Sequence, residues 1–83
     1  MNTYSDLIVA CGMTATSDPI EIDARAQEVM EDSSLSLRAR ALFILLCELR
    51  GEPHNPFAEP YEPAEVIHGA VEELVAAGLI IRV

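Results

Sequence analysis

The chain has 83 residues, which is enough for one domain and too few for two. Apolar residues make up 51% of it, so intrinsic disorder is not expected, and no apolar run approaches the roughly 20 residues that a membrane span needs. The formal net charge of −9 at pH 7, with five arginines and no lysine, repels nucleic-acid phosphates and anionic lipids and favours a basic partner surface.

Residues 1–17 are predicted to form an N-terminal arm that contains one short strand. The apolar run from Leu7 to Cys11 supplies that strand, with a helical segment as the alternative. No basic region precedes this run, so we expect no signal peptide and a cytoplasmic location.

The first helix is predicted over residues 18–32. Asp18 can cap it, Pro19 suits the first helical position, and Glu21 completes a capping-box spacing. At about 100° per residue, one stripe holds Ile22, Ala26, Val29 and Met30. The opposite side holds Glu21, Arg25, Glu28 and Asp32, and the first two are spaced as a favourable ion pair.

The second helix is predicted over residues 36–50, with Ser36 as its cap and Gly51 as its stop. Its apolar run from Leu42 to Cys47 leaves no wide polar face. A helix that is apolar nearly all round is usually buried nearly all round, so we expect this helix to be the centre of the core.

Residues 51–63 hold four of the five prolines, and a regular helix does not tolerate that density. We therefore expect an extended loop. Its aromatic residues, Phe57 and Tyr61, are expected to hold the loop against the body by packing. The alternative is that they form an aromatic pair offered to a partner.

The third helix is predicted over residues 63–77, with Pro63 at its first position and Gly78 as its stop. Its outward half is expected to hold Glu65, His68, Gly69, Glu72, Glu73 and Ala76. Residues 79–83 read as a strand, and Leu7–Cys11 is the expected pairing partner.

Together these elements predict a mainly α fold: three helices with a small two- or three-stranded sheet, in a single domain over residues 1–83 whose helical body spans 18–83. The expected core consists of Leu42, Leu45, Leu46, Leu49, Ile67, Val71 and Leu74.

Residues 35–83 resemble a winged helix-turn-helix domain of the kind found in phage and mobile-element regulatory or replication proteins. "LSLRARALFILLCELRG" is similar to the helix that opens many such domains, and "AEVIHGAVEELVAAGLIIRV" resembles their recognition helix leading into the wing. The sequence departs from that pattern in three ways. A proline-rich loop replaces the short helix before the recognition helix, the wing is truncated, and the face that would read DNA carries Glu65, Glu72 and Glu73 without Arg or Lys.

No residue pattern indicates catalysis, and we expect no enzyme activity and no cofactor. The possible metal ligands Cys11, Cys47, His54 and His68 are scattered without a closing spacing, so no metal site is expected. The arginines at 38, 40 and 50 are expected to pair with the acidic excess.

The function favoured by these observations is a small acidic module that binds and modulates a larger protein with a basic surface. The expected binding residues are Glu65, Glu72 and Glu73 with Glu59 and Glu62 of the loop, and Phe57 and Tyr61 are further candidate contacts. The alternative is a winged-helix regulator of transcription or replication that still binds DNA; a structural subunit is a third reading. We expect self-association as a homodimer, and no membrane partner.

Overall fold

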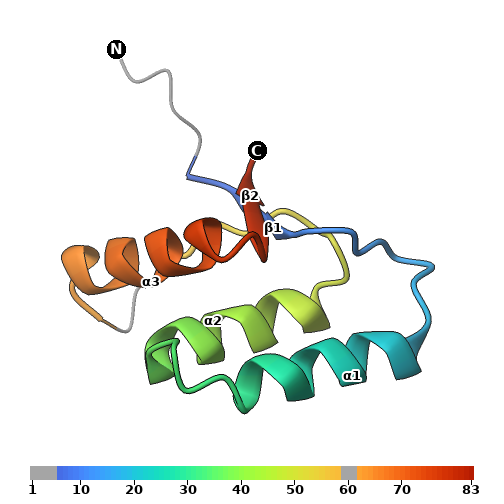
Figure 1. Cartoon of the computed structure of the whole chain (residues 1–83). Helices are drawn as coiled ribbons and strands as arrows, with labels where there is room; N and C mark the ends of the chain where they lie inside the picture. The colour runs from blue at the N-terminus through green and yellow to red at the C-terminus, as the bar shows by residue number, and fades with distance from the viewer. Residues whose placement is uncertain (1–5, 59–61) are drawn as a thin grey trace.

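The computed structural model describes residues 6–58 and 62–83. In chain order the elements are β1 (Ile8–Ala10), α1 (Pro19–Met30), α2 (Leu37–Glu48), α3 (Ala64–Ala76) and β2 (Ile80–Arg82). Figure 1 shows α1 and α2 side by side, with α3 and the sheet on the far side of α2 from α1. The predicted mainly α class, three helices with a small sheet, is confirmed, and the sheet has two antiparallel strands.

The helices begin and end where local signals predicted. The side chains of Asp18 and Ser36 each accept a hydrogen bond from a backbone N–H in the first turn of the helix they precede, at 2.9 and 3.1 Å. Pro63 lies one position earlier than expected, as the cap residue before α3. The glycines after α2 and α3, Gly51 and Gly78, have φ of 85° and 74°, the left-handed conformation that a glycine stop adopts without strain.

Helix α2 is the central element, as predicted. It packs against α1 on one side and against α3 and β1 on the other. Its buried residues are Ala39, Phe43, Leu46 and Cys47. They form one core with buried residues from every other element, among them Ile8, Val29, Leu74 and Ile80.

The expectation that α2 is buried nearly all round was wrong. Leu45 is 40% exposed and Leu37 is 76% exposed, because none of the described residues covers the sectors of the helix on which they lie. Of the predicted core, Leu46, Val71 and Leu74 are buried. Leu42, Leu49 and Ile67 are partly buried against that core.

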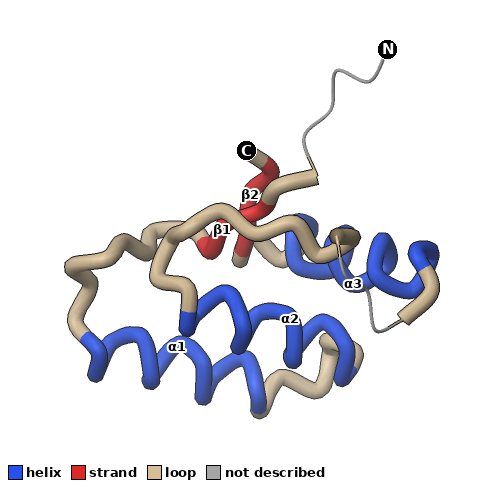
Figure 2. The backbone as a smooth tube through the Cα atoms, turned by 180° about the vertical axis from the view of Figure 1, so that it is seen from behind, coloured by secondary structure: helices blue, strands red, loops and turns tan. Residues whose placement is uncertain are grey.

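The sheet joins the two ends of the chain. Strand β1 pairs with β2 in the register Ile8↔Arg82, Val9↔Ile81 and Ala10↔Ile80, which confirms the predicted pairing. On its other edge, the N–H of Ile8 donates to the carbonyl of His54 at 2.9 Å, and the N–H of His54 donates back at 3.0 Å. Strand β1 therefore lies between the C-terminal strand and the proline-rich loop, as the tube in Figure 2 shows from behind.

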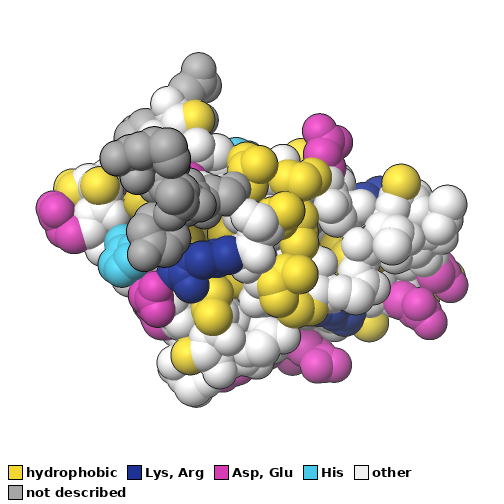
Figure 3. All heavy atoms as spheres, turned by 90° about the horizontal axis from the view of Figure 1, so that it is seen from above, with side chains coloured by type: hydrophobic (Ala, Val, Ile, Leu, Met, Phe, Trp, Pro, Cys, Tyr) yellow, Lys and Arg dark blue, Asp and Glu magenta, His cyan; other side chains and the backbone are white. Residues whose placement is uncertain are grey.

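Both faces of this sheet carry apolar side chains. Because side chains alternate along a strand, Ile8, Ala10 and Ile80 point inward, and they are buried. On the opposite face Ile81 and Val83 are 53% and 56% exposed. Figure 3, seen from above, shows hydrophobic side chains gathered in the middle of the visible surface with charged side chains around them.

One prediction for the outer face of α1, the ion pair between Glu21 and Arg25, was wrong. Arg25 does not pair with Glu21; its Nη1 donates to the carbonyl oxygen of Cys11 at 2.6 Å, and its guanidinium lies 5.7 Å from the centre of the Phe43 ring. A carbonyl shielded from water needs a donor, and the long arginine side chain can reach this half-buried one from the edge of the helix. Met30, expected on the inner stripe, is 52% exposed at the last position of the helix.

None of the helices in the described part of the chain is both long and apolar enough to cross a membrane.

Candidate interaction surface

The outward face of α3 is formed by five exposed residues at helical spacing. They are Glu65, His68, Gly69, Glu72 and Ala76. Positions three, four and seven apart lie on one side of an α-helix, so these residues form one continuous surface. We call this surface the α3 face. Two of the predicted binding residues, Glu65 and Glu72, lie on it.

The negative charge of Glu72, toward the C-terminal end of the α3 face, is partly neutralised within the molecule. Its carboxylate forms an ion pair with the guanidinium of Arg82 on β2, and it lies 3.8 Å from Nε2 of His68 one turn earlier. The residue thus connects α3 to the sheet as well as lying at the surface. Glu65, at the opposite end, has no ion pair with another described residue.

Glu73 does not lie on the α3 face, which corrects its predicted placement. Its carboxylate accepts a hydrogen bond of 2.8 Å from the backbone N–H of Ser36 and another of 2.7 Å from the Ser36 hydroxyl. These bonds, the backbone one foremost, hold the pKa of the Glu73 carboxyl below its usual value. Because Ser36 also caps α2, Glu73 connects α3 to the start of α2.

The acidic residues of the proline-rich loop have different placements. Glu62 is partly buried, and its Oε1 lies 3.3 Å from Nε of Arg38, so its charge is matched within the molecule. Glu52 is exposed. Glu59 and Tyr61, two of the predicted contacts, lie outside the described residues.

Phe57 is half-buried, and its backbone N–H donates to Oδ1 of Asn55 at 2.9 Å. The neighbouring Pro56 is buried. This half of the loop is therefore held close to the body at Pro56, while Phe57 is only half-buried.

Of the three arginines expected to pair with the acidic excess, Arg38 does so, whereas Arg40 binds backbone carbonyls. Arg38 pairs with Glu62. Arg40 instead donates from Nε to the carbonyl of Leu35 at 3.0 Å and from Nη1 to the carbonyl of Met30 at 3.4 Å. The turn between α1 and α2 leaves these carbonyls without helical partners, and an arginine one turn into the next helix can satisfy them.

Helix α1 carries an acidic surface that the prediction overlooked. Its one basic residue, Arg25, is turned inward, which leaves the carboxylates around it uncompensated. Exposed acidic residues in and beside this helix are Asp18, Glu21, Asp23, Glu28, Glu31 and Asp32. The excess is visible in the composition of residues 18–32, but only the structure shows that the arginine does not offset it.

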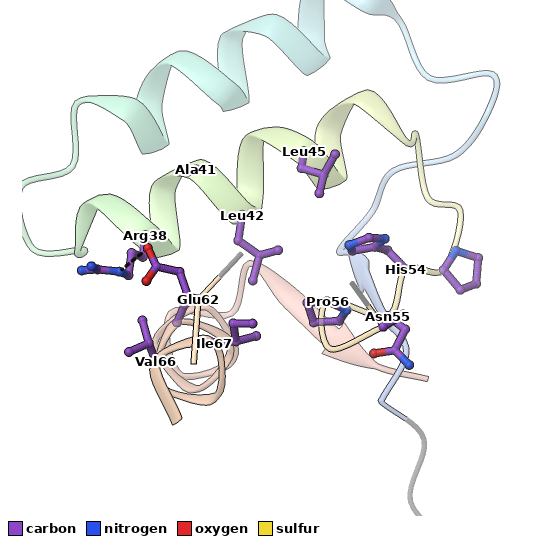
Figure 4. Close-up of a pocket in the computed structure, with 13 residues that line it drawn as sticks. Arg38, Ala41, Leu42, Leu45, His54, Asn55, Pro56, Glu62, Val66 and Ile67 are labelled. Atoms are coloured by element: carbon purple, nitrogen blue, oxygen red, sulfur yellow. Dashed lines mark ion pairs between the residues drawn. The ribbon is translucent and has the colours of Figure 1, made fainter. Parts of the chain in front are cut away.

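An open groove of about 830 Å³ lies between α2, α3 and the proline-rich loop. Apolar side chains line most of it: Leu42, Leu45, Pro56, Val66, Ile67 and Ala70. Figure 4 shows the Arg38–Glu62 ion pair at one end of this groove, and His54 with Asn55 at the other. The groove was not predicted, because its position depends on how α2 and α3 pack.

Neither a metal site nor a disulfide is present among the described residues. No group of three His, Cys, Asp or Glu side chains there could hold a metal ion, and Cys11 and Cys47 are both free thiols. Burial raises the pKa of the Cys47 thiol, the reverse of what an activated nucleophile requires.

Comparison with known proteins adds no further information on function. No protein-family model, curated protein or solved structure matches the chain. The α3 face, the acidic surface of α1 and the groove are therefore the features from which a function has to be argued.

Proposed function

We propose that this protein is a small acidic interaction module that binds a larger protein with a basic surface and modulates it. In this proposal the α3 face makes the contact, with Glu65 and Glu72 supplying negative charge on either side of Gly69. A regulator of the phage or mobile-element type is the biological setting that the winged-helix resemblance implies.

The observation that carries the proposal is the position of Gly69. It lies in the middle of α3 on the exposed side, and a Cβ atom added there would meet nothing within 4 Å. Glycine in a helix interior costs about 1 kcal/mol relative to alanine, and packing within the described part of the molecule gives no reason for it here. A glycine on a surface does permit another molecule to approach the helix backbone closely.

The charge of the molecule indicates the kind of partner. A net charge of −9 on 83 residues produces a field that attracts a basic surface and speeds its association. The same field opposes binding to DNA, and the α3 face offers no Arg or Lys to contact a phosphate or a base. A protein partner is therefore favoured over the DNA-binding alternative.

The test compares immobilised wild-type protein with two variants in the source-cell lysate, followed by quantitative mass spectrometry. In Gly69→Gln the longer side chain should block close approach, so the partner should be lost from the captured set. Glu28→Gln, a change of one exposed carboxylate on α1, is the matched control and should retain the partner.

The proposal fails if every captured protein is retained equally by Gly69→Gln and Glu28→Gln. A gel-shift assay at low salt addresses the alternative directly. If duplex DNA is shifted by the wild type and not by Gly69→Gln, α3 is a DNA-binding helix.

Two further parts of the proposal concern location and self-association. We place the protein in the cytoplasm, and we propose a homodimer formed through the exposed apolar face of the sheet, where Ile81 and Val83 lie. Sedimentation equilibrium of the wild type and of Ile81→Lys should give a dimer and a monomer. A monomeric wild type at high concentration would rule out the homodimer.

A further inference from the structure

The groove between α2, α3 and the proline-rich loop has the dimensions of a binding site for a short segment of protein. Along α2 its lining runs from Arg38 to Leu45, which at 1.5 Å per residue is about 10 Å. Two successive turns of a helix laid along it would place apolar side chains at i and i+4 inside it, since such side chains are about 6 Å apart along the axis.

The lining of the groove is apolar and remains open to water. Leu45 is 40% exposed, and Leu42, Val66 and Ile67 are only partly buried. Figure 4 shows Leu42 and Leu45 of α2 and Val66 and Ile67 of α3 around this space. Apolar side chains that enter the groove would remove this surface from water, at roughly 25 cal/mol for each Å² buried.

The charges in and beside the groove select the kind of segment. Arg38 at one end is already paired with Glu62 at 3.3 Å. Among the described residues next to a lining residue in the sequence, Glu52 and Glu65 are exposed carboxylates. The one arginine in such a position, Arg40, donates to the backbone carbonyls of Leu35 and Met30 instead. The apolar lining is thus bordered by net negative charge, which complements Lys or Arg and repels carboxylates.

We infer that this groove binds a basic amphipathic helix, whose apolar side chains enter between α2 and α3 while its Lys or Arg side chains face the surrounding carboxylates. The inference rests on the proposed function, because the basic partner is taken from there, and it adds a second contact that shares only Glu65 with the α3 face. Leu45 is the residue of α2 that the bound helix would contact.

The experiment uses a synthetic peptide of about 14 Leu and Lys residues, with leucines at i, i+3, i+4 and i+7, and a scrambled peptide of the same composition. Fluorescence anisotropy measures the binding of each to the whole protein. The amphipathic peptide should bind more tightly than the scrambled one. Leu45→Gln should weaken that binding about tenfold, the effect of losing roughly 1.4 kcal/mol of contact.

Leu37→Gln is the matched control. Leu37 lies on the same helix, is 76% exposed and is not part of the groove, so this change should leave peptide binding unaltered. NMR on the wild type provides a second measurement that does not depend on any variant folding. The amide shifts that move on peptide addition should be those of Leu42, Leu45, Val66 and Ile67.

Several results would overturn the inference: equal binding of the two peptides, equal loss in Leu45→Gln and Leu37→Gln, or shift changes outside the groove. In each case the capture experiment with Gly69→Gln still decides the proposed function, since Gly69 does not line the groove. Conversely, peptide binding that depends on Leu45 would stand even if no captured protein depended on Gly69.

Discussion

Ser36 and Glu73 are joined by two hydrogen bonds that connect the residue just before α2 to the last turn of α3. The Ser36 backbone N–H and hydroxyl both donate to the Glu73 carboxylate, at 2.8 and 2.7 Å, and the same hydroxyl oxygen accepts from the N–H of Ala39. One serine therefore caps its own helix and holds a second helix in place.

This contact should make stability fall in acid. Because its pKa in the folded state is lowered from the usual 4.5, Glu73 stabilises the fold above that pH, and this contribution is lost as pH falls through the lowered value. Glu73→Gln should lower the melting temperature at neutral pH and have less effect in acid. The check is a series of thermal melts from about pH 7 to about pH 3.

Glu65→Gln is the control for that series, since Glu65 has no ion pair with a described residue. Asp32 also has a lowered pKa, chiefly from its side-chain hydrogen bond with Ser34, and it remains in every variant. If the melting temperatures of Glu73→Gln and wild type differ by the same amount at every pH, Glu73 is not the source of the acid sensitivity.

Substituting Gly51 should be far more damaging than substituting Gly78. Both have positive φ, which costs roughly 1–2 kcal/mol for alanine. At Gly51, however, the new Cβ would lie 2.2 Å from the carbonyl oxygen of Met13, whereas at Gly78 it would meet nothing within 4 Å. Urea denaturation should therefore show a larger loss for Gly51→Ala, and equal losses would mean that the contact with Met13 is easily relieved.

Two adjacent leucines of α2 should respond differently to truncation. Leu46 is 1% exposed and Leu45 is 40% exposed. Leu46→Ala should cost about 2–5 kcal/mol in the free energy of unfolding, because it leaves a cavity in the core. Leu45→Ala should cost about 1 kcal/mol or less, since its side chain already contacts water. Chemical denaturation of both variants under one set of conditions makes the comparison. A larger loss of stability for Leu45→Ala would mean that α2 turns Leu45, and not Leu46, toward the core.

Gly69→Ala should stabilise the protein. The substitution adds a methyl group where there is open space and removes the flexibility of a glycine in mid-helix, so a gain of about 0.5–1 kcal/mol is expected. A higher melting temperature measured by circular dichroism would agree with this. A loss of stability would indicate that something packs closely against the helix at this point.

The two thiols should react at different rates. Cys47 is buried, and burial raises its pKa, whereas Cys11 is half-buried. Alkylation of the native protein by iodoacetamide should therefore modify Cys11 first, because the thiolate is the reacting species. In denaturant the difference should disappear, and peptide mapping by mass spectrometry distinguishes the sites.

Much of the fold could be predicted because its signals are local. Asp18 and Ser36 as caps and Gly51 and Gly78 as stops set the helix boundaries without reference to the rest of the chain. The pairing of the two strands could be predicted because a single strand is not stable alone and Leu7–Cys11 was the other segment read as a strand.

The site was predicted less well because its residues depend on distant neighbours. A helical wheel places Glu73 on the same outward half of the helix as Glu72. It does not show that Ser36, 37 positions away in the sequence, donates hydrogen bonds to the Glu73 carboxylate. The same is true of Leu45, whose sector of α2 is apolar but happens to face an open groove. Arg25 was assigned to solvent because the carbonyl that it satisfies belongs to Cys11, outside its own helix.

The position of β1 also has a consequence for the order of folding. Its two neighbours in space, His54 and β2, are both far along the chain, so the sheet needs the closure of long loops, while each helix forms from contiguous residues. During synthesis we expect the first strand to remain without its β2 partner until the last strand has left the ribosome. We therefore expect the helices to assemble first around Phe43 and the sheet to close over them last.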